Sequence, residues 1–219
     1  IPDVLIAGAD QLHLFDTPIF LTREYALTVE QRMAKRMIDL VLSLVLTILT
    51  SPIMLITAIC IKCYDGGPIL YKQTRCTCGG REFRIMKFRS MKVDAEKDGV
   101  ARLASRNDSR ITPIGKFIRM VRIDELPQLF NILKGDMSFV GFRPVCTSEK
   151  KLNALRRKMG VFEGRPGLTG YAQVLGRDSI GVARKARLDA EYQRKRSLRL
   201  DLWCIVKSVT VVLSGSGVM

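Results

Sequence analysis

The sequence predicts an α+β fold that is mainly helical and contains a small β-hairpin. Three observations predict it. An apolar run occupies residues 37–61, two short alternating segments flank Gly79-Gly80, and five later segments repeat apolar residues at helical spacing. With 219 residues, the chain has room for one ordinary domain with appendages.

Residues 1–30 come before the apolar run and carry Pro2, Pro18 and only short apolar stretches. We interpret them as a linker or the tail of an upstream region. The start at Ile1 shows no basic segment followed by an apolar one, so no secretory signal is expected. The six cysteines are then expected to be reduced thiols in the cytosol. Cys60-x-x-Cys63 with Cys76-x-Cys78 is a conceivable zinc site, but the spacing favours plain cysteines.

The apolar run at residues 37–61 has one charge, Asp39. A straight helix of this length would reach about 37 Å, enough for a hydrocarbon core of about 30 Å. A buried core helix is disfavoured because the run is apolar on every face. Lys and Arg are concentrated on both flanks, which favours both ends on the cytoplasmic side. We therefore predict a re-entrant membrane helix over 31–64, broken at Ser51-Pro52, rather than a spanning helix.

From residue 65 onward the pattern is that of a soluble domain. Segments around 69–71 and 82–88 alternate and are joined through Gly79-Gly80, which predicts the β-hairpin. Apolar residues at helical spacing predict helices over 114–122, 126–133, 152–159, 183–196 and 202–213. The last of these carries Trp203 and is either a core helix or an interfacial helix on lipid.

The charge balance indicates a protein that binds phosphate. Lys and Arg number 36 against 21 acids, a formal net charge of +15. One histidine makes a His-based zinc hydrolase or a Ser-His-Asp triad improbable, and 7% aromatic residues supply few stacking platforms for single-stranded nucleic acid. The usual nucleotide loops, such as G-x-x-x-x-G-K-[ST], are absent from the sequence.

The adjacent acids Asp124-Glu125 are the main candidate for chemistry. Before Pro127 they suit the first turn of a helix, where acids face the positive end of the dipole. They could instead divide two tasks, in which one carboxylate attacks phosphorus and the other holds a divalent cation. Arg119 and Arg122 would then offset the charge of substrate phosphate, although both could simply lie on a solvated face.

Three basic segments are candidates for binding phosphate. Lys87 and Arg89 share one side of a strand, which suits a diphosphate but is also typical of a basic outer face. The turns 141–144 and 165–170 expose backbone N–H groups beside Arg143 and Arg165. Such turns form anion nests or act as simple connectors.

Taken in this order, the segments resemble the bacterial monotopic phosphoglycosyl transferases over residues 33–213. The matching segments are Lys35-Arg36-x-x-Asp39, Ser51-Pro52, 67–75, 87–91, 122–138, Arg165-Pro-Gly-Leu-Thr-Gly170 with Gln173, and Leu188-Asp189-x-x-Tyr192. The family usually has proline where Phe142 stands. In the family the membrane segment is a re-entrant helix broken at Ser-Pro, in agreement with the charge argument.

The resemblance implies transfer of a sugar-1-phosphate from a UDP-sugar to polyprenol (undecaprenyl) phosphate, with release of UMP. It makes Asp124 the nucleophile that forms an aspartyl-phosphosugar intermediate, and Glu125 the Mg²⁺ ligand. Residues 65–219 are then a cytosolic catalytic domain with membrane-associated helices, held at the cytoplasmic face of the bacterial inner membrane among phospholipids. The implied substrate-binding residues are Lys87, Arg89, Arg119, Arg143 and Arg165 for phosphate, with Gly167, Thr169 and Gln173 in the nucleotide loop.

Two rival functions stay open at this point. A membrane-tethered nucleic-acid-binding module explains the net charge but leaves Asp124-Glu125 unused, so we expect no nucleic-acid partner. A catalytically silent scaffold is the second rival. The identity of the sugar and the formation of a homodimer are also open.

Overall fold

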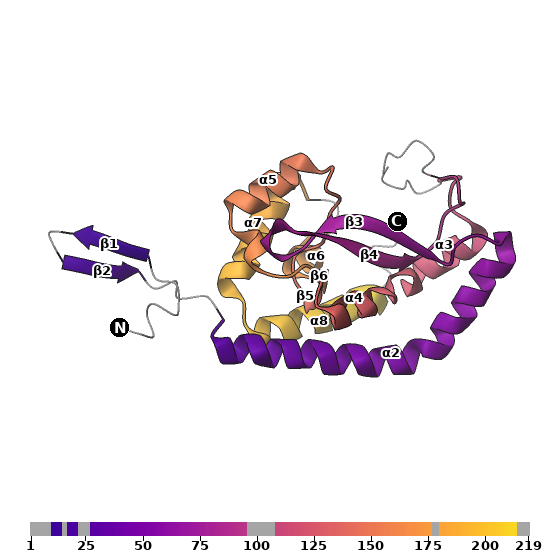
Figure 1. The fold of residues 1–219 in the computed structure, drawn as a ribbon, viewed down its shortest axis with the longest axis horizontal. Coiled ribbons are helices and arrows are strands. Elements are labelled where there is room, and N and C mark those ends of the chain that lie inside the picture. The colour runs from indigo at the N-terminus through magenta and orange to yellow at the C-terminus, as the bar shows by residue number, and fades with distance from the viewer. Residues whose placement is uncertain (1–9, 15–16, 22–26, 96–107, 177–179, 214–219) are drawn as a thin grey trace.

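The computed structural model describes residues 10–14, 17–21, 27–95, 108–176 and 180–213. It confirms a mainly helical α+β fold with small sheets (Figure 1). The helices are α2 (Val29–Asp65), α3 (Pro113–Met120), α4 (Gln128–Lys134), α5 (Lys150–Lys158), α6 (Tyr171–Leu175), α7 (Val182–Lys195) and α8 (Leu198–Leu213). The strands are β1 (Asp10–Leu14), β2 (Thr17–Leu21), β3 (Leu70–Cys76), β4 (Glu82–Phe88), β5 (Ser138–Val140) and β6 (Gly167–Thr169).

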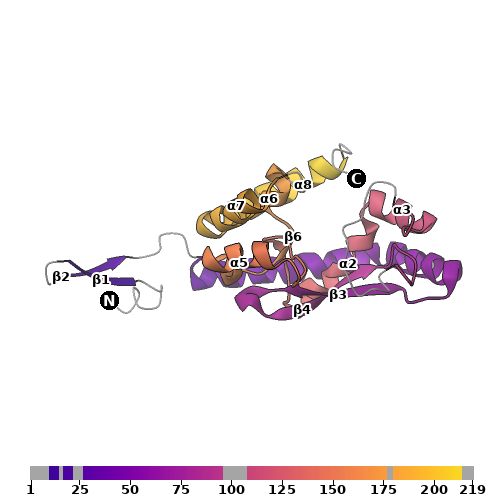
Figure 2. The same cartoon turned by 90° about the horizontal axis from the view of Figure 1, so that it is seen from above.

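The strands form three separate pairs. β3 and β4 are the predicted hairpin, antiparallel with Leu70 opposite Phe88. β5 and β6 form a short parallel pair, and β1 and β2 form an antiparallel hairpin inside the segment that we interpreted as a linker. Figure 2 shows the β3–β4 hairpin on one side of the domain and α7 and α8 on the other.

Helix α2 extends through the whole apolar run. Thr28 caps its start by a capping box with Gln31, and Gly66 ends it in a left-handed conformation. It therefore begins two residues before and ends one residue after the predicted 31–64. The break predicted at Ser51-Pro52 takes the form of a bend: the helix continues through Pro52, and Figure 1 shows it changing direction in its second half.

Helix α2 continues through Pro52 because the side chain of Ser51 supplies the hydrogen bond that the backbone of Pro52 cannot donate. Proline has no N–H to donate to the carbonyl of Ile48, four residues earlier. Ser51 Oγ donates to that carbonyl at 2.8 Å. Thr50 and Thr57 likewise donate to the carbonyls four residues before them. The helix thus keeps its polar groups bonded internally, as a segment in hydrocarbon must.

Most of the apolar surface of α2 is exposed. By length and composition it can cross a membrane, and only 11% of its most apolar window is buried. This exposure excludes the core-helix alternative. The large apolar side chains left exposed include Val41, Leu44, Val45, Ile48, Leu49, Leu55 and Ile56.

The opposite face of α2 packs on the core. Leu42 and Leu46 lie against a cluster built around Leu129 and Ile132 of α4. Further along, Ile61 packs with Phe88 of β4 and Ile118 of α3. One side of α2 therefore contacts the domain on both sides of the bend.

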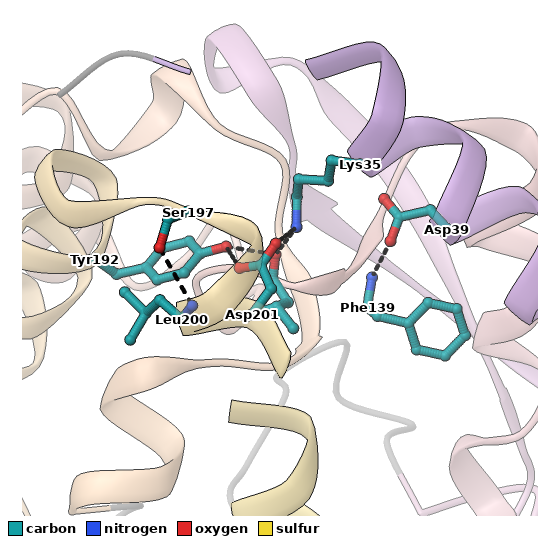
Figure 3. A network of polar contacts seen from close by, with 8 residues as sticks. Lys35, Asp39, Phe139, Tyr192, Ser197, Leu200 and Asp201 are labelled. Atoms are coloured by element: carbon teal, nitrogen blue, oxygen red, sulfur yellow. Dashed lines mark hydrogen bonds and ion pairs between the residues drawn. The ribbon is translucent and has the colours of Figure 1, made fainter. Parts of the chain in front are cut away.

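A buried polar network fixes the start of α2 to α8 and β5 (Figure 3). Lys35 Nζ lies 2.5 Å from Asp201 Oδ2 and 3.2 Å from the carbonyl of Val140. The hydroxyl of Tyr192 donates to Asp201 at 2.6 Å, and Asp39 accepts a hydrogen bond from the N–H of Phe139. These groups satisfy one another away from water, so they set how α2 meets the domain.

The predicted helices over 114–122, 126–133, 152–159, 183–196 and 202–213 correspond to α3, α4, α5, α7 and α8. The boundaries differ by at most four residues, and the end of α8 at Leu213 is as predicted. Helix α6 and the β5–β6 pair were not predicted. The face of α8 that carries Cys204 is buried, whereas the face that carries Trp203 is exposed. Helix α8 is therefore not a core helix buried on all sides, and the interfacial alternative stays a prediction.

Candidate active site

Asp124 and Glu125 lie in a single 3₁₀ turn, Ile123–Glu125, between α3 and α4. Arg122, just before it, has φ 59° and ψ 19°, a left-handed conformation that non-glycine residues rarely adopt. Helix α4 starts after Pro127, which gives no side-chain cap, and neither acid caps the helix. The helix-capping interpretation of the pair is therefore wrong.

Glu125 is held by cations from two other segments. Lys87 Nζ of β4 lies 2.6 Å from Glu125 Oε1, and Arg143, in the loop after β5, lies 3.9 Å from the same oxygen. Burial alone would raise the pKa of Glu125, but Lys87, Arg143 and Arg122 lower it to about 2. Glu125 is thus a carboxylate at all physiological pH values.

Asp124 has the opposite environment. Burial and the neighbouring charge of Glu125 raise its pKa to about 6, against the attraction of Lys87, Arg119 and Arg122. Its carboxylate accepts no hydrogen bond from the residues that the structure describes. A desolvated carboxylate without donors is more reactive toward an electrophile than an ordinary surface aspartate.

The acid pair can hold a divalent cation only if substrate or water supplies further ligands. Among the described residues, no group of three or more His, Cys, Asp or Glu side chains is arranged around a common metal position. Glu125 is ionised, and its Oε2 accepts no hydrogen bond within the described part of the chain. Mg²⁺ is commonly held by one or two carboxylates together with substrate phosphates and water. The residues present fit that arrangement.

Arg89 lies apart from the acid pair. Its guanidinium forms a two-pronged ion pair with Asp65, at the end of α2, and its side chain is 7% exposed. It therefore joins the end of β4 to the end of α2 and does not face the same site as Lys87. The side chain of Arg165 is exposed.

The turn 165–170 packs against the turn that carries Arg143. A Cβ on Gly167 would lie 2.1 Å from the backbone nitrogen of Gly141, so only glycine allows this approach. Gly141 N–H donates to the carbonyl of Thr169 at 2.9 Å. The Thr169 hydroxyl bonds Ser208 of α8, and Gln173 donates to the carbonyl of Leu168.

Sequence reasoning missed the residue that holds the backbone of Arg143 in place. The buried Arg156 of α5 bonds Asp189 of α7 at 2.9 and 2.6 Å and donates to the carbonyl of Arg143 at 2.9 Å. Phe142 lies beneath this guanidinium, with its ring centroid 5.1 Å away, and meets Phe162 edge to face. Asp189 was a motif residue, but nothing in the sequence singles out Arg156.

The fold and the site define a class of protein. An exposed apolar helix is packed on a small α+β domain, and a reactive carboxylate stands beside an ionised one among cations. That arrangement suits chemistry on a phosphate group near a lipid surface. The comparison with protein families agrees, since residues 30–215 match the model of the bacterial sugar transferases. The chain belongs to this family.

Curated relatives cover most of this chain. A UDP-N-acetylgalactosamine-undecaprenyl-phosphate N-acetylgalactosaminephosphotransferase of Aeromonas hydrophila is 40% identical over 84% of the chain and 44% of the relative. A UDP-glucose:undecaprenyl-phosphate glucose-1-phosphate transferase of Caulobacter vibrioides is 38% identical over 82% of the chain and 70% of the relative. The exopolysaccharide production protein ExoY of Rhizobium meliloti is 35% identical over 84% and 88%. The chain thus spans less than half of the Aeromonas protein.

Proposed function

We propose that this chain transfers a sugar-1-phosphate from a UDP-sugar to polyprenol phosphate and releases UMP. The observation that carries the proposal is the Asp124 carboxyl, which is poorly stabilised as an anion and stands beside the Lys87–Glu125–Arg143 cluster. The names of the relatives supply the donor and acceptor classes. Because those names include both glucose and N-acetylgalactosamine, they leave the sugar open.

In the first step an oxygen of Asp124 attacks the β-phosphorus of the UDP-sugar. A new O–P bond forms, the bond from that phosphorus to the α–β bridging oxygen breaks, and UMP leaves with the bonding electrons. A carboxylate approaching a diphosphate meets like-charge repulsion. Lys87, Arg119 and Arg143 lower that repulsion by neutralising phosphate oxygens.

In the second step an oxygen of polyprenol phosphate attacks the phosphorus held on Asp124. The acyl-phosphate bond breaks and the Asp124 carboxylate is restored, so the phosphosugar ends on the lipid. Each transfer uses the same aspartate, which predicts ping-pong kinetics. The nucleotide half-reaction therefore needs no acceptor lipid.

Mg²⁺ would be held by Glu125 together with substrate oxygens and would neutralise diphosphate charge when bound. Lys87 occupies Glu125 Oε1, so the open Oε2 is the oxygen offered to the cation. The Lys87 contact also keeps Glu125 ionised and facing the site.

The exposed apolar face of α2 supports membrane association, and Lys and Arg on both flanks support a re-entrant path with both ends at the cytoplasmic face. The bend at Pro52 is compatible with that path. A helix held in one leaflet would keep Asp124 at the depth of lipid phosphates, where a soluble donor and a lipid acceptor both reach it.

The test is UMP formation by the purified chain with Mg²⁺, a panel of UDP-sugars and undecaprenyl phosphate. We expect turnover with one or a few donors. Without acceptor lipid, a burst of UMP should stop near one equivalent per active site, and labelled phosphosugar should stay on the protein. UMP formed only when acceptor is present would contradict the covalent route.

A further inference from the structure

A cavity separate from the acid pair opens between α6, α7 and the start of α8. Its volume is about 490 Å³. The walls are mainly the aromatic and aliphatic side chains of Tyr171, Leu175, Leu200 and Trp203, and the two ring systems of Tyr171 and Trp203 lie 6.1 Å apart. None of the predicted site residues lines this cavity.

The charged residues around this cavity favour an anion. Lys195, Arg199 and Glu191 contribute charge to the lining, two cations against one acid. Lys195 is paired with Glu191 at 2.7 Å. The side chain of Arg199 makes no ion pair or hydrogen bond with any residue in the described ranges, so its charge is the one left for a ligand.

The cavity continues into an exposed apolar stripe. Trp203 lines the cavity and also belongs to the outer face of α8, together with Leu202, Val206 and Val209. These four side chains are between 37% and 63% exposed. A tryptophan between a charged rim and an apolar stripe is typical of the membrane interface.

We propose that this cavity binds the headgroup of an anionic glycerophospholipid, with the phosphate at Arg199, the glycerol region between Tyr171 and Trp203, and the acyl chains along the outer face of α8. The proposal rests on the membrane association in the proposed function but not on the chemistry of Asp124. A nucleotide would also suit two aromatic rings and a cation. The stripe on α8 favours a lipid, because a nucleotide leaves such a surface uncovered.

The test uses Trp203, the single tryptophan of the chain, whose emission reports on the boundary between this cavity and the apolar stripe of α8. The full chain in neutral detergent is titrated at fixed salt with dihexanoyl phosphatidylglycerol, below its micelle concentration, and with dihexanoyl phosphatidylcholine. We expect a saturable blue shift at about fivefold lower concentration for phosphatidylglycerol, since one cation near a headgroup favours it by about that factor. Inorganic phosphate should give no blue shift.

Arg199→Gln should remove the preference between the two lipids and leave the response to phosphatidylcholine. The matched control is Arg184→Gln, an equal loss of charge on the exposed surface of α7 outside the cavity, which should keep the preference. Three results would overturn the proposal: no blue shift, a preference retained by Arg199→Gln, or saturation by UMP in place of lipid. No UDP-sugar is turned over in this titration, so it fails or succeeds independently of UMP release.

Discussion

The buried guanidinium of Arg156 donates a hydrogen bond of 2.9 Å to the backbone carbonyl of Arg143. The other side of the same guanidinium is bound to Asp189. Arg156 therefore joins α5 and α7 to the turn that carries Arg143, whose side chain faces Glu125. It touches no acid of the site, so we assign it a positioning role that acts through Arg143.

Arg156→Lys tests this role. Lysine keeps the charge beside Asp189 but lacks the planar fork that reaches Asp189 and the Arg143 carbonyl together. We expect kcat/KM for UMP release to fall by about tenfold. In an Arg143→Ala background the same change should have little further effect, because the residue it positions is gone.

The neighbouring Arg157→Lys is the matched control, since Arg157 is exposed on the same helix and contacts Phe162 rather than the Arg143 turn. It should leave kcat/KM unchanged. A full tenfold loss from Arg156→Lys in the Arg143→Ala background would show that Arg156 does not act through Arg143. Thermal melts of the four variants and the wild type separate misfolding from mispositioning.

Asp124→Asn should abolish UMP release and also stabilise the metal-free protein. The pKa of Asp124 is raised from 3.8 to about 6, so the folded state binds the proton more tightly than the unfolded state. The stabilisation that this proton gives to the folded state is fully present below about pH 4 and is lost as the pH rises through about 6. Above that pH the ionised, buried carboxylate costs on the order of 3 kcal/mol.

Denaturant unfolding of wild type and Asp124→Asn in EDTA, at pH 4 and pH 7.5, measures this cost. The variant should be the more stable protein at pH 7.5, and the two should converge at pH 4. Glu82→Gln, at an exposed acid at the start of β4, is the control that should change neither activity nor stability. Equal stabilities at pH 7.5 would mean that Asp124 is not desolvated.

Local patterns predicted most of the helices and the β3–β4 hairpin, because periodicity and Gly79-Gly80 are properties of neighbouring residues. The site was predicted only in part. Lys87 and Glu125 are 38 positions apart in the sequence and were brought together only by the fold. Periodicity also placed Arg89 with Lys87, but β4 ends at Phe88, and Asp65 binds Arg89 instead.

The contacts that sequence reasoning missed are nonlocal. The parallel β5–β6 pair is three residues long on each side and depends on the close approach of Gly141 and Gly167. Arg156 reads as one more cation on a basic helix, and only its complete burial beside Asp189 reveals its role. Similarly, the sequence Ser51-Pro52 suggests a helix break, yet the Ser51 hydroxyl donates to the carbonyl of Ile48 and the helix continues.

Mg²⁺ binding should depend on the donor substrate. The described residues offer only two carboxylates at the site, too few for tight binding of the ion alone. We expect weak Mn²⁺ binding, followed as a Mg²⁺ substitute by electron paramagnetic resonance, that strengthens at least about tenfold with UDP-sugar in the Asp124→Asn protein. Adding Glu125→Gln should remove the strengthening. Equally tight binding with and without UDP-sugar would indicate a site made by protein alone.

The path of α2 can be tested at its two ends. With the six native cysteines replaced by serine, Glu30→Cys and Tyr64→Cys place one thiol near each end of the helix, and a re-entrant path predicts that an impermeant maleimide reaches both from the same side. Pro52→Ala restores a backbone donor and removes the ring clash, so α2 should straighten and a fraction of the Tyr64→Cys thiols should become accessible from the opposite side. Thr50→Ala, which removes only side-chain hydrogen bonds to the carbonyl of Leu46 and the sulfur of Met54, should leave the labelling unchanged. If the two thiols are labelled from opposite sides in the protein with Pro52 intact, the bent helix crosses the membrane. Asp124 would then need another means of staying at the depth of the lipid phosphates.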